Sequence, residues 1–131
     1  MSQFQKQLAA FRKKAVTDTD ATKRAIILEL FGSVVMDTPV REGRARGNWQ
    51  ASFNSPISGE TARKDKNGAL VINEIIGALK PGDGVWWLTN NLPYIARLEY
   101  DGHSKQAPEG MVRKNVSRIE SIVKKAAKQS K

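Results

Sequence analysis

Few side chains in this 131-residue chain have the types and spacing that catalysis or metal binding requires. The single histidine, His103, precedes Ser104, but neighbours in sequence rarely have the geometry of a nucleophile and its base. One histidine and no cysteine cannot supply the nitrogen and sulfur ligands of a zinc site. A pair of carboxylates acting as acid and base stays open, although none stands in a motif. We therefore expect no enzyme, no metal and no cofactor.

The segment VREGRARG (40–47) is an expected loop with two glycines and three arginines, Arg41, Arg44 and Arg46. It lacks the Gly-Lys-Ser/Thr ending and the preceding apolar strand of a phosphate-binding P-loop. Two interpretations of these arginines stay open. They contact nucleic-acid phosphates, or they pair with carboxylates on a neighbouring subunit. We favour the second, because the chain shows no helix-turn-helix, zinc-finger or RNA-recognition signature.

The three tryptophans, Trp49, Trp86 and Trp87, lie in segments with the spacing of β-strands. Stacking on nucleic-acid bases is one use of such side chains. Aromatic residues on strands are more often part of a core or of a protein interface. We expect core or interface here.

Composition indicates one folded, basic domain covering residues 1–131. Hydrophobic residues make up 40% and charged residues 27%, and the net charge is +9. The positive excess lies at both ends and in the arginine segment, which suits phosphate or an acidic protein partner and equally suits ordinary solvated helix faces. No apolar run is long enough to span a membrane, and residues 1–14 lack the core of a signal peptide. With no cysteine present, we expect assembly in the cytoplasm.

Helical periodicity predicts a short amphipathic arm near the N-terminus (within 1–16), a long helix over about 20–37 and another over 109–128. Pro39 should end the first long helix. Its expected buried stripe is Ile27, Leu30, Phe31 and Val34, with Lys23, Arg24 and Glu29 off it. The expected stripe of the last helix is Val112, Val116, Ile119, Val123 and Ala126. We expect the arm and the basic tail (126–131) to be mobile.

Between the long helices, residues 48–54 alternate as a strand whose inner face is Trp49, Ala51 and Phe53. Residues 55–68 have little to bury, and we expect a neighbouring molecule to order them, with a mobile loop as the alternative. Residues 71–79 suit a buried helix, with a strand as the alternative. Residues 85–89 are apolar on both faces and should be covered on both sides, on one of them by a second subunit. Pro93 should open a short helix.

The predicted class is therefore α+β, with a small antiparallel sheet packed against the two long helices and shorter helices between them. The region from about residue 25 to 123 also resembles the neck or tail-completion protein family of long-tailed bacteriophages. The residues that carry this resemblance are Thr38-Pro39-Val40, Gly43-Arg44, Asn48-Trp49, Asn90-Asn91, Pro93-Tyr94, Leu98-Glu99-Tyr100, Gly102, Gln106-Ala107-Pro108 and Gly110-Met111. The chain departs from the family pattern at Glu42 and Asp101.

The resemblance implies a structural virion protein without enzymatic activity. It implies a homo-oligomeric ring, six-fold by analogy, which joins the tail tube to the connector around the DNA channel and touches DNA nonspecifically at most. The alternative function is a small basic nucleic-acid-binding protein. The expected subunit or partner contacts are Arg41, Arg44, Arg46, Trp49, Trp86, Trp87, Tyr94 and Tyr100. The expected structural positions of the motif are Pro39, Gly43, Asn90, Pro93, Glu99, Gly102, Pro108 and Gly110.

Overall fold

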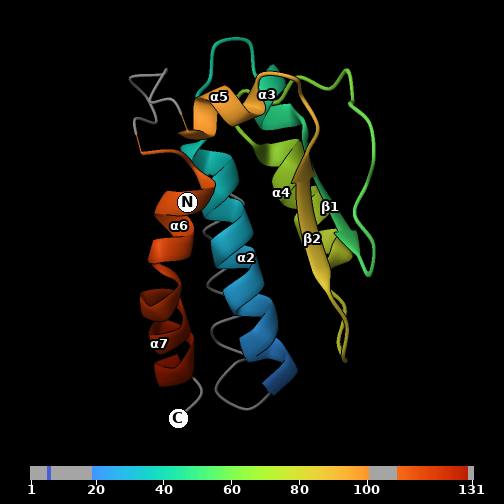
Figure 1. Ribbon diagram of the computed structural model, residues 1–131. Coiled ribbons are helices and arrows are strands. Elements are labelled where there is room, and N and C mark those ends of the chain that lie inside the picture. Colours follow the sequence, from blue (N-terminus) through green and yellow to red (C-terminus); the bar gives the residue numbers. More distant parts are fainter. Residues whose placement is uncertain (1–5, 7–18, 101–108, 130–131) are drawn as a thin grey trace.

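The computed structural model describes residues 6, 19–100 and 109–129 of the chain, and its class is a small α+β fold (Figure 1). The expected arm (apart from Lys6), the loop at 101–107 and the side chains of the basic tail lie outside that description. In chain order the elements are α2 (Thr19–Asp37), α3 (Arg44–Gly47), β1 (Trp49–Phe53), α4 (Ala69–Ala78), β2 (Trp86–Asn90), α5 (Ile95–Tyr100), α6 (Val112–Ser117) and α7 (Ile119–Gln129).

Helix α2 is the central rod of the molecule, with α6 and α7 along one side and α4 along another (Figure 1). It ends at Asp37, where the Thr38 hydroxyl donates a 2.7 Å hydrogen bond to the Val34 carbonyl and Pro39 prevents continuation. The predicted bounds are confirmed, but the buried stripe is only partly right. The fully buried residues include Leu28 and Val35, which were not predicted.

Two further side chains of α2 differ from the predicted stripe. Leu30 is only partly buried, whereas Glu29, expected off the stripe, is buried. Its carboxylate lies 4.0 Å from the Lys125 ammonium of α7, so the charge is held between the two helices. A buried carboxylate needs such partners, and hydrophobic periodicity cannot reveal them.

The sheet is a two-stranded antiparallel ribbon in which Ala51 lies opposite Leu88 and Phe53 opposite Trp86. These pairs form the inner face, and α4 packs against it. The Phe53 and Trp86 rings are tilted by 58° with centroids 5.0 Å apart. Asn48, predicted on the wet side of the strand, is instead buried. Its amide donates to the Arg44 carbonyl and accepts from the Thr61 amide.

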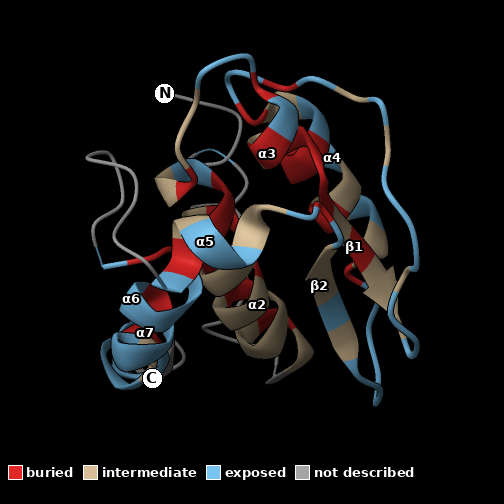
Figure 2. Ribbon diagram, turned by 45° about the horizontal axis from the view of Figure 1, so that its top comes forward, coloured by how far each residue is buried: buried red, intermediate tan, exposed pale blue. Residues whose placement is uncertain are grey.

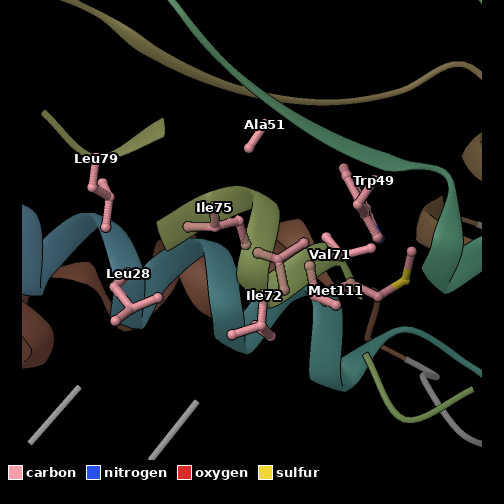
Figure 3. Close-up of a cluster of buried hydrophobic side chains, with 10 residues drawn as sticks. Leu28, Trp49, Ala51, Val71, Ile72, Ile75, Leu79 and Met111 are labelled. Atoms are coloured by element: carbon pink, nitrogen blue, oxygen red, sulfur yellow. The ribbon is translucent and has the colours of Figure 1, made fainter. Parts of the chain in front are cut away.

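Helix α4 fills the space between α2 and the sheet, and its helical assignment settles the helix-or-strand alternative at residues 71–79. Val71, Ile72 and Ile75 are buried, and they meet Leu28 and Trp49 in one core (Figure 3). The helix starts after Gly68, whose positive φ of 78° turns the chain, and the buried Asp65 carboxylate accepts the Val71 amide at 2.9 Å.

The predicted helix over 109–128 is wrong as a single rod. It is two helices that meet at Arg118, and both pack on α2. The expected buried stripe is wrong at Val112, Val116 and Val123, which are exposed. Ile119 is partly buried, and the side chain of Ala126 lies outside the description. The buried residues are Met111, Asn115 and Ile122.

Segment 55–68 runs beside β1 as an extended loop (Figure 2). Contacts within the same chain hold it in place, so no neighbouring molecule is required to order it. The Asn91 amide donates to the carbonyls of Ile57 and Gly59, each at 2.9 Å, and the buried Asp65 amide donates to the Gly43 carbonyl. No helix among the described residues is both long and apolar enough for a membrane span.

Candidate interaction site

Arg46 is used inside the fold. The segment expected to be a loop folds as the single helical turn α3, which directs the Arg46 guanidinium towards three carbonyls. Its hydrogen bonds to Lys66, Met36 and Thr38 measure 2.6, 2.9 and 3.0 Å. Burial lowers its pKa, and the charges of Asp65 and Asp37 oppose that shift. Arg46 therefore ties α2 to the loop and is not free for DNA or for a neighbouring subunit.

Arg44 and Arg41 are both exposed. Arg44 pairs with Glu60 of the long loop at 3.2 Å, so a carboxylate of its own chain already meets this arginine. Among the described residues, Arg41 shows no hydrogen bond or ion pair. Of the three arginines, Arg41 is thus the one whose charge faces outward without a partner in the described part of the chain.

The expected contact residue Trp49 is also part of the fold. Its side chain is 5% exposed, and its indole N–H donates to the buried Thr38 hydroxyl at 2.7 Å. Trp86 is partly buried, donates to the Ala78 carbonyl at 2.8 Å and lies 5.5 Å from the Lys23 ammonium. Neither indole is placed to stack on a base or on a partner.

Trp87 differs from the other two tryptophans. It lies opposite Ser52 on the outer face of the sheet, where its side chain is 40% exposed, and the neighbouring Val85 is 56% exposed. Within the described part of the chain, only the long loop reaches this face, where the Gly59 carbonyl accepts a hydrogen bond from the Gln50 side chain. Trp87 and Val85 therefore stay exposed on the second side of the predicted two-sided strand. Aromatic side chains left on a surface are frequent anchors of protein interfaces.

The two tyrosines lie at α5, Tyr94 directly before the helix and Tyr100 at its last position. Tyr94 is partly buried, and Tyr100 is 65% exposed. The Arg113 guanidinium sits 5.0 Å from the Tyr100 ring centroid. Tyr100 and Trp87 are therefore on different elements and do not form one patch.

Glu99 is the most elaborately bound motif residue. Its buried carboxylate accepts the backbone amides of Met111, Val112 and Arg113 at 2.8–3.0 Å, at the start of α6. The Arg113 side chain also donates to this carboxylate and to the Glu99 carbonyl. Burial alone would raise the pKa of Glu99, but the hydrogen bonds from Arg113, Val112 and Met111 outweigh it and hold the pKa below its usual value.

Two close contacts of the motif residues require a glycine. Gly110 has a φ of +81°, and a Cβ there would collide with the Glu99 carboxylate. Gly43 has a φ of +86°, and a Cβ there would lie 2.7 Å from the Lys66 amide nitrogen. Asn90 makes a third close contact, since its side chain donates to the Ala45 carbonyl and accepts a hydrogen bond from the Leu92 amide.

The remaining motif prolines and glycine are placed more simply. Pro39 follows the end of α2, and Pro93 lies in the turn before α5. Gly102 and Pro108 lie outside the described residues.

The sequence did not predict the polar residues that hold the long loop in place. Arg63 donates to the carbonyls of Gly47 and Trp49, each at 2.8 Å, and pairs with Glu74 at 3.3 Å. Glu74 in turn accepts the Ala51 amide at 3.0 Å. Arg63 was part of a stretch that seemed to have little to bury, and no periodic signal marks such a residue.

No group of histidine, cysteine, aspartate and glutamate side chains in the described ranges is arranged to hold a metal ion. Comparison of the chain with protein-family models, with curated proteins and with solved structures finds no match.

Proposed function

We propose that this chain is a structural protein of the head–tail joint in a long-tailed bacteriophage. In this role it is a neck or tail-completion component, made in the host cytoplasm and retained in the virion. Copies form a ring that joins the tail tube to the connector and leaves a channel for DNA. The observation that carries the proposal is the order and spacing of the motif residues between about residues 25 and 123.

The functions of the motif residues in the fold support this reading. Four motif residues make close contacts between elements: Gly43, Asn90, Glu99 and Gly110. Residues that hold elements together in this way are expected to recur in proteins with the same backbone, even where the surface residues differ. The motif residues that the structure describes are thus framework residues rather than exposed side chains, which supports the proposal.

The surface supports an interaction role over a catalytic one. Exposed apolar and aromatic side chains stand on several of the described elements, and aromatic ones such as Trp87 and Tyr100 are frequent anchors of protein interfaces. The largest exposures belong to Tyr100, Val85, Leu70, Val116, Val123 and Trp87. A ring subunit touches two copies of itself through different surfaces, and a joint protein also touches a partner at each end.

The test is assembly with the partners. The purified chain should be mixed with tail-tube protein and with connector protein, separately and together, and examined by native mass spectrometry and electron microscopy. We expect closed rings of this chain bound to the tube end or to the connector. A chain that joins neither partner under any of these conditions would contradict the proposal.

The second candidate function is nucleic-acid binding, and the exposed basic residues favour it. Arg41 has no partner among the described residues, and Arg113, Lys114, Lys124 and Lys125 are exposed along α6 and α7. If these residues contact phosphates, affinity for duplex DNA should fall steeply with salt. Replacing Arg41 and Lys124 by alanine should flatten that dependence, whereas replacing the internal Arg46 should unfold the protein instead. Absence of binding at low salt removes this candidate.

A further inference from the structure

The two outer edges of the sheet are treated differently by the rest of the chain. In the ribbon, the Asn54 amide donates to the Val85 carbonyl, while the Ala51 amide and the Trp49 carbonyl point away from β2. Backbone groups alternate in direction along a strand. On β2, therefore, the backbone groups of Trp86, Leu88 and Asn90 point away from β1 and form the second outer edge.

The edge of β1 is closed by side chains. Glu74 accepts the Ala51 amide at 3.0 Å, and Arg63 donates to the Trp49 carbonyl at 2.8 Å. The two side chains also pair with each other at 3.3 Å. No further strand can bind to this edge without displacing them.

The edge of β2 has no such closure. Within the described part of the chain, no hydrogen bond reaches the outward backbone groups of Leu88, and both views show β2 paired on one side only (Figures 1 and 2). The strand, WWLTN, holds no charge and no proline, the residues with which proteins usually protect an exposed edge. It is the kind of edge that accepts another strand.

We propose that two copies of this chain pair in solution through their β2 strands, antiparallel and about a two-fold axis. The partner strand is β2 itself, because it is the open edge that the described residues present while β1 is closed. Placing Leu88 opposite its own copy sets Trp86 opposite Asn90, and about six backbone hydrogen bonds then join the copies. Neither strand carries charge at the contact, although each molecule has a net charge of +9.

The same register gives Trp87 a role. On the outer face, Trp87 of one copy lies opposite Thr89 of the other, and the two Trp87 rings lie diagonally across the axis. Diagonal neighbours of that kind are within reach of aromatic side chains. The pairing therefore covers part of the exposed apolar area on this face.

This pairing goes beyond the proposed ring. A two-fold contact uses the same surface on both copies, whereas a ring needs different surfaces to meet head to tail. The dimer is a separate form of the free protein, and its mass, twice 14.5 kDa, distinguishes it from any larger ring.

The first test is mass against concentration for the full chain, by sedimentation or light scattering. We expect a monomer–dimer equilibrium. Trp87→Lys should raise the dissociation constant at least about tenfold, because both copies lose cross-strand contacts and gain charge at the edge. Ser52→Lys is the matched control. It adds the same charge to the same face but one strand farther from the axis, and should leave the constant within about threefold. Circular dichroism of each variant checks its fold.

The second test is hydrogen exchange of single amides by NMR. The Leu88 amide should exchange at least about tenfold more slowly in the dimer than in the monomer, while the Thr89 amide, bonded to β1, serves as the internal reference. A monomer at every concentration would overturn the pairing. So would a dimer that forms without protecting Leu88, or a larger ring in which Leu88 is protected. Protection that appears only with tail-tube protein would assign the edge to that partner instead.

Discussion

The Glu99 carboxylate gives the fold a measurable dependence on pH. Its pKa is lowered in the folded state, so the stability it provides is present above the unfolded pKa of about 4.3 and is lost as pH falls through the folded value. We expect Glu99→Gln to lower the free energy of unfolding at pH 7 by about 1–3 kcal/mol, because three backbone donors lose a charged acceptor. Urea unfolding between pH 7 and pH 3 measures both effects.

Glu60→Gln is the control for this prediction. Glu60 also pairs with an arginine, but both partners are exposed, and such pairs contribute about 0–1 kcal/mol. The free energy of unfolding of the Glu60 variant should still fall as the pH is lowered, a decline that the Glu99 variant should lack. Equal curves for the two variants would show that the Glu99 hydrogen bonds do not stabilise α6.

Gly43 and Gly59 separate backbone conformation from steric contact, since both have a φ of +86°. Alanine at Gly59 meets open space, so Gly59→Ala should cost only the conformational penalty of about 1–2 kcal/mol. At Gly43, the added Cβ would also lie 2.7 Å from a backbone nitrogen that cannot move alone. We expect Gly43→Ala to cost at least about 2 kcal/mol more than Gly59→Ala in thermal or urea unfolding. Equal losses would argue against the close contact with the loop.

At the scale of elements, substitutions of two neighbouring residues test which side of α7 packs against α2. Ile122 is 1% exposed and Val123 is 43% exposed, the reverse of the sequence-based prediction. Ile122→Ala should lower the free energy of unfolding by about 2–4 kcal/mol through the lost apolar contacts and the cavity. Val123→Ala should change it by less than about 1 kcal/mol. Urea unfolding of the two variants shows which residue faces α2. A larger loss of unfolding free energy for Val123→Ala would support the predicted stripe instead.

The error at α6 and α7 has a physical origin. Apolar residues lie on more than one side of this segment, so periodicity alone could not say which side meets α2. The structure buries a polar residue in the contact. Asn115 is fully buried, and its amide donates to Asp37 and to the Met111 carbonyl at 2.8 Å each. A satisfied asparagine costs little to bury, but it carries no signal in a hydrophobic pattern.

The elements with strong local signals were predictable. A long run with helical periodicity followed by Pro39 predicted α2 to within one residue, and strict alternation predicted β1. Helix α3 was not predictable, because four residues hold no period and its start depends on the left-handed Gly43. The seating of the loop escaped prediction for a related reason. Arg63 binds backbone groups that become neighbours only in the folded chain.

At the scale of the whole molecule, charge and apolar surface are distributed differently. The chain carries a net charge of +9, while the exposed edge and outer face of β2 are uncharged. Copies of the molecule therefore repel one another at long range, whereas in the proposed pairing the surfaces in contact carry no charge. A polyanion such as DNA experiences the opposite, attraction at long range by the same positive charge.

Salt should therefore change the two kinds of binding in opposite directions. Raising NaCl from about 50 to 500 mM screens the repulsion between like-charged copies, so association of the chain with itself should strengthen. Over the same range, any affinity for duplex DNA should fall steeply, because binding releases counterions from the DNA and this release is less favourable at higher salt. Sedimentation for the copies and fluorescence anisotropy for a labelled duplex measure the two slopes. Sucrose at matched osmolality is the control, since it carries no charge and should reproduce neither slope. Self-association that weakens with salt would mean that the copies meet through charged residues, the exposed arginines among them, rather than through the neutral strand.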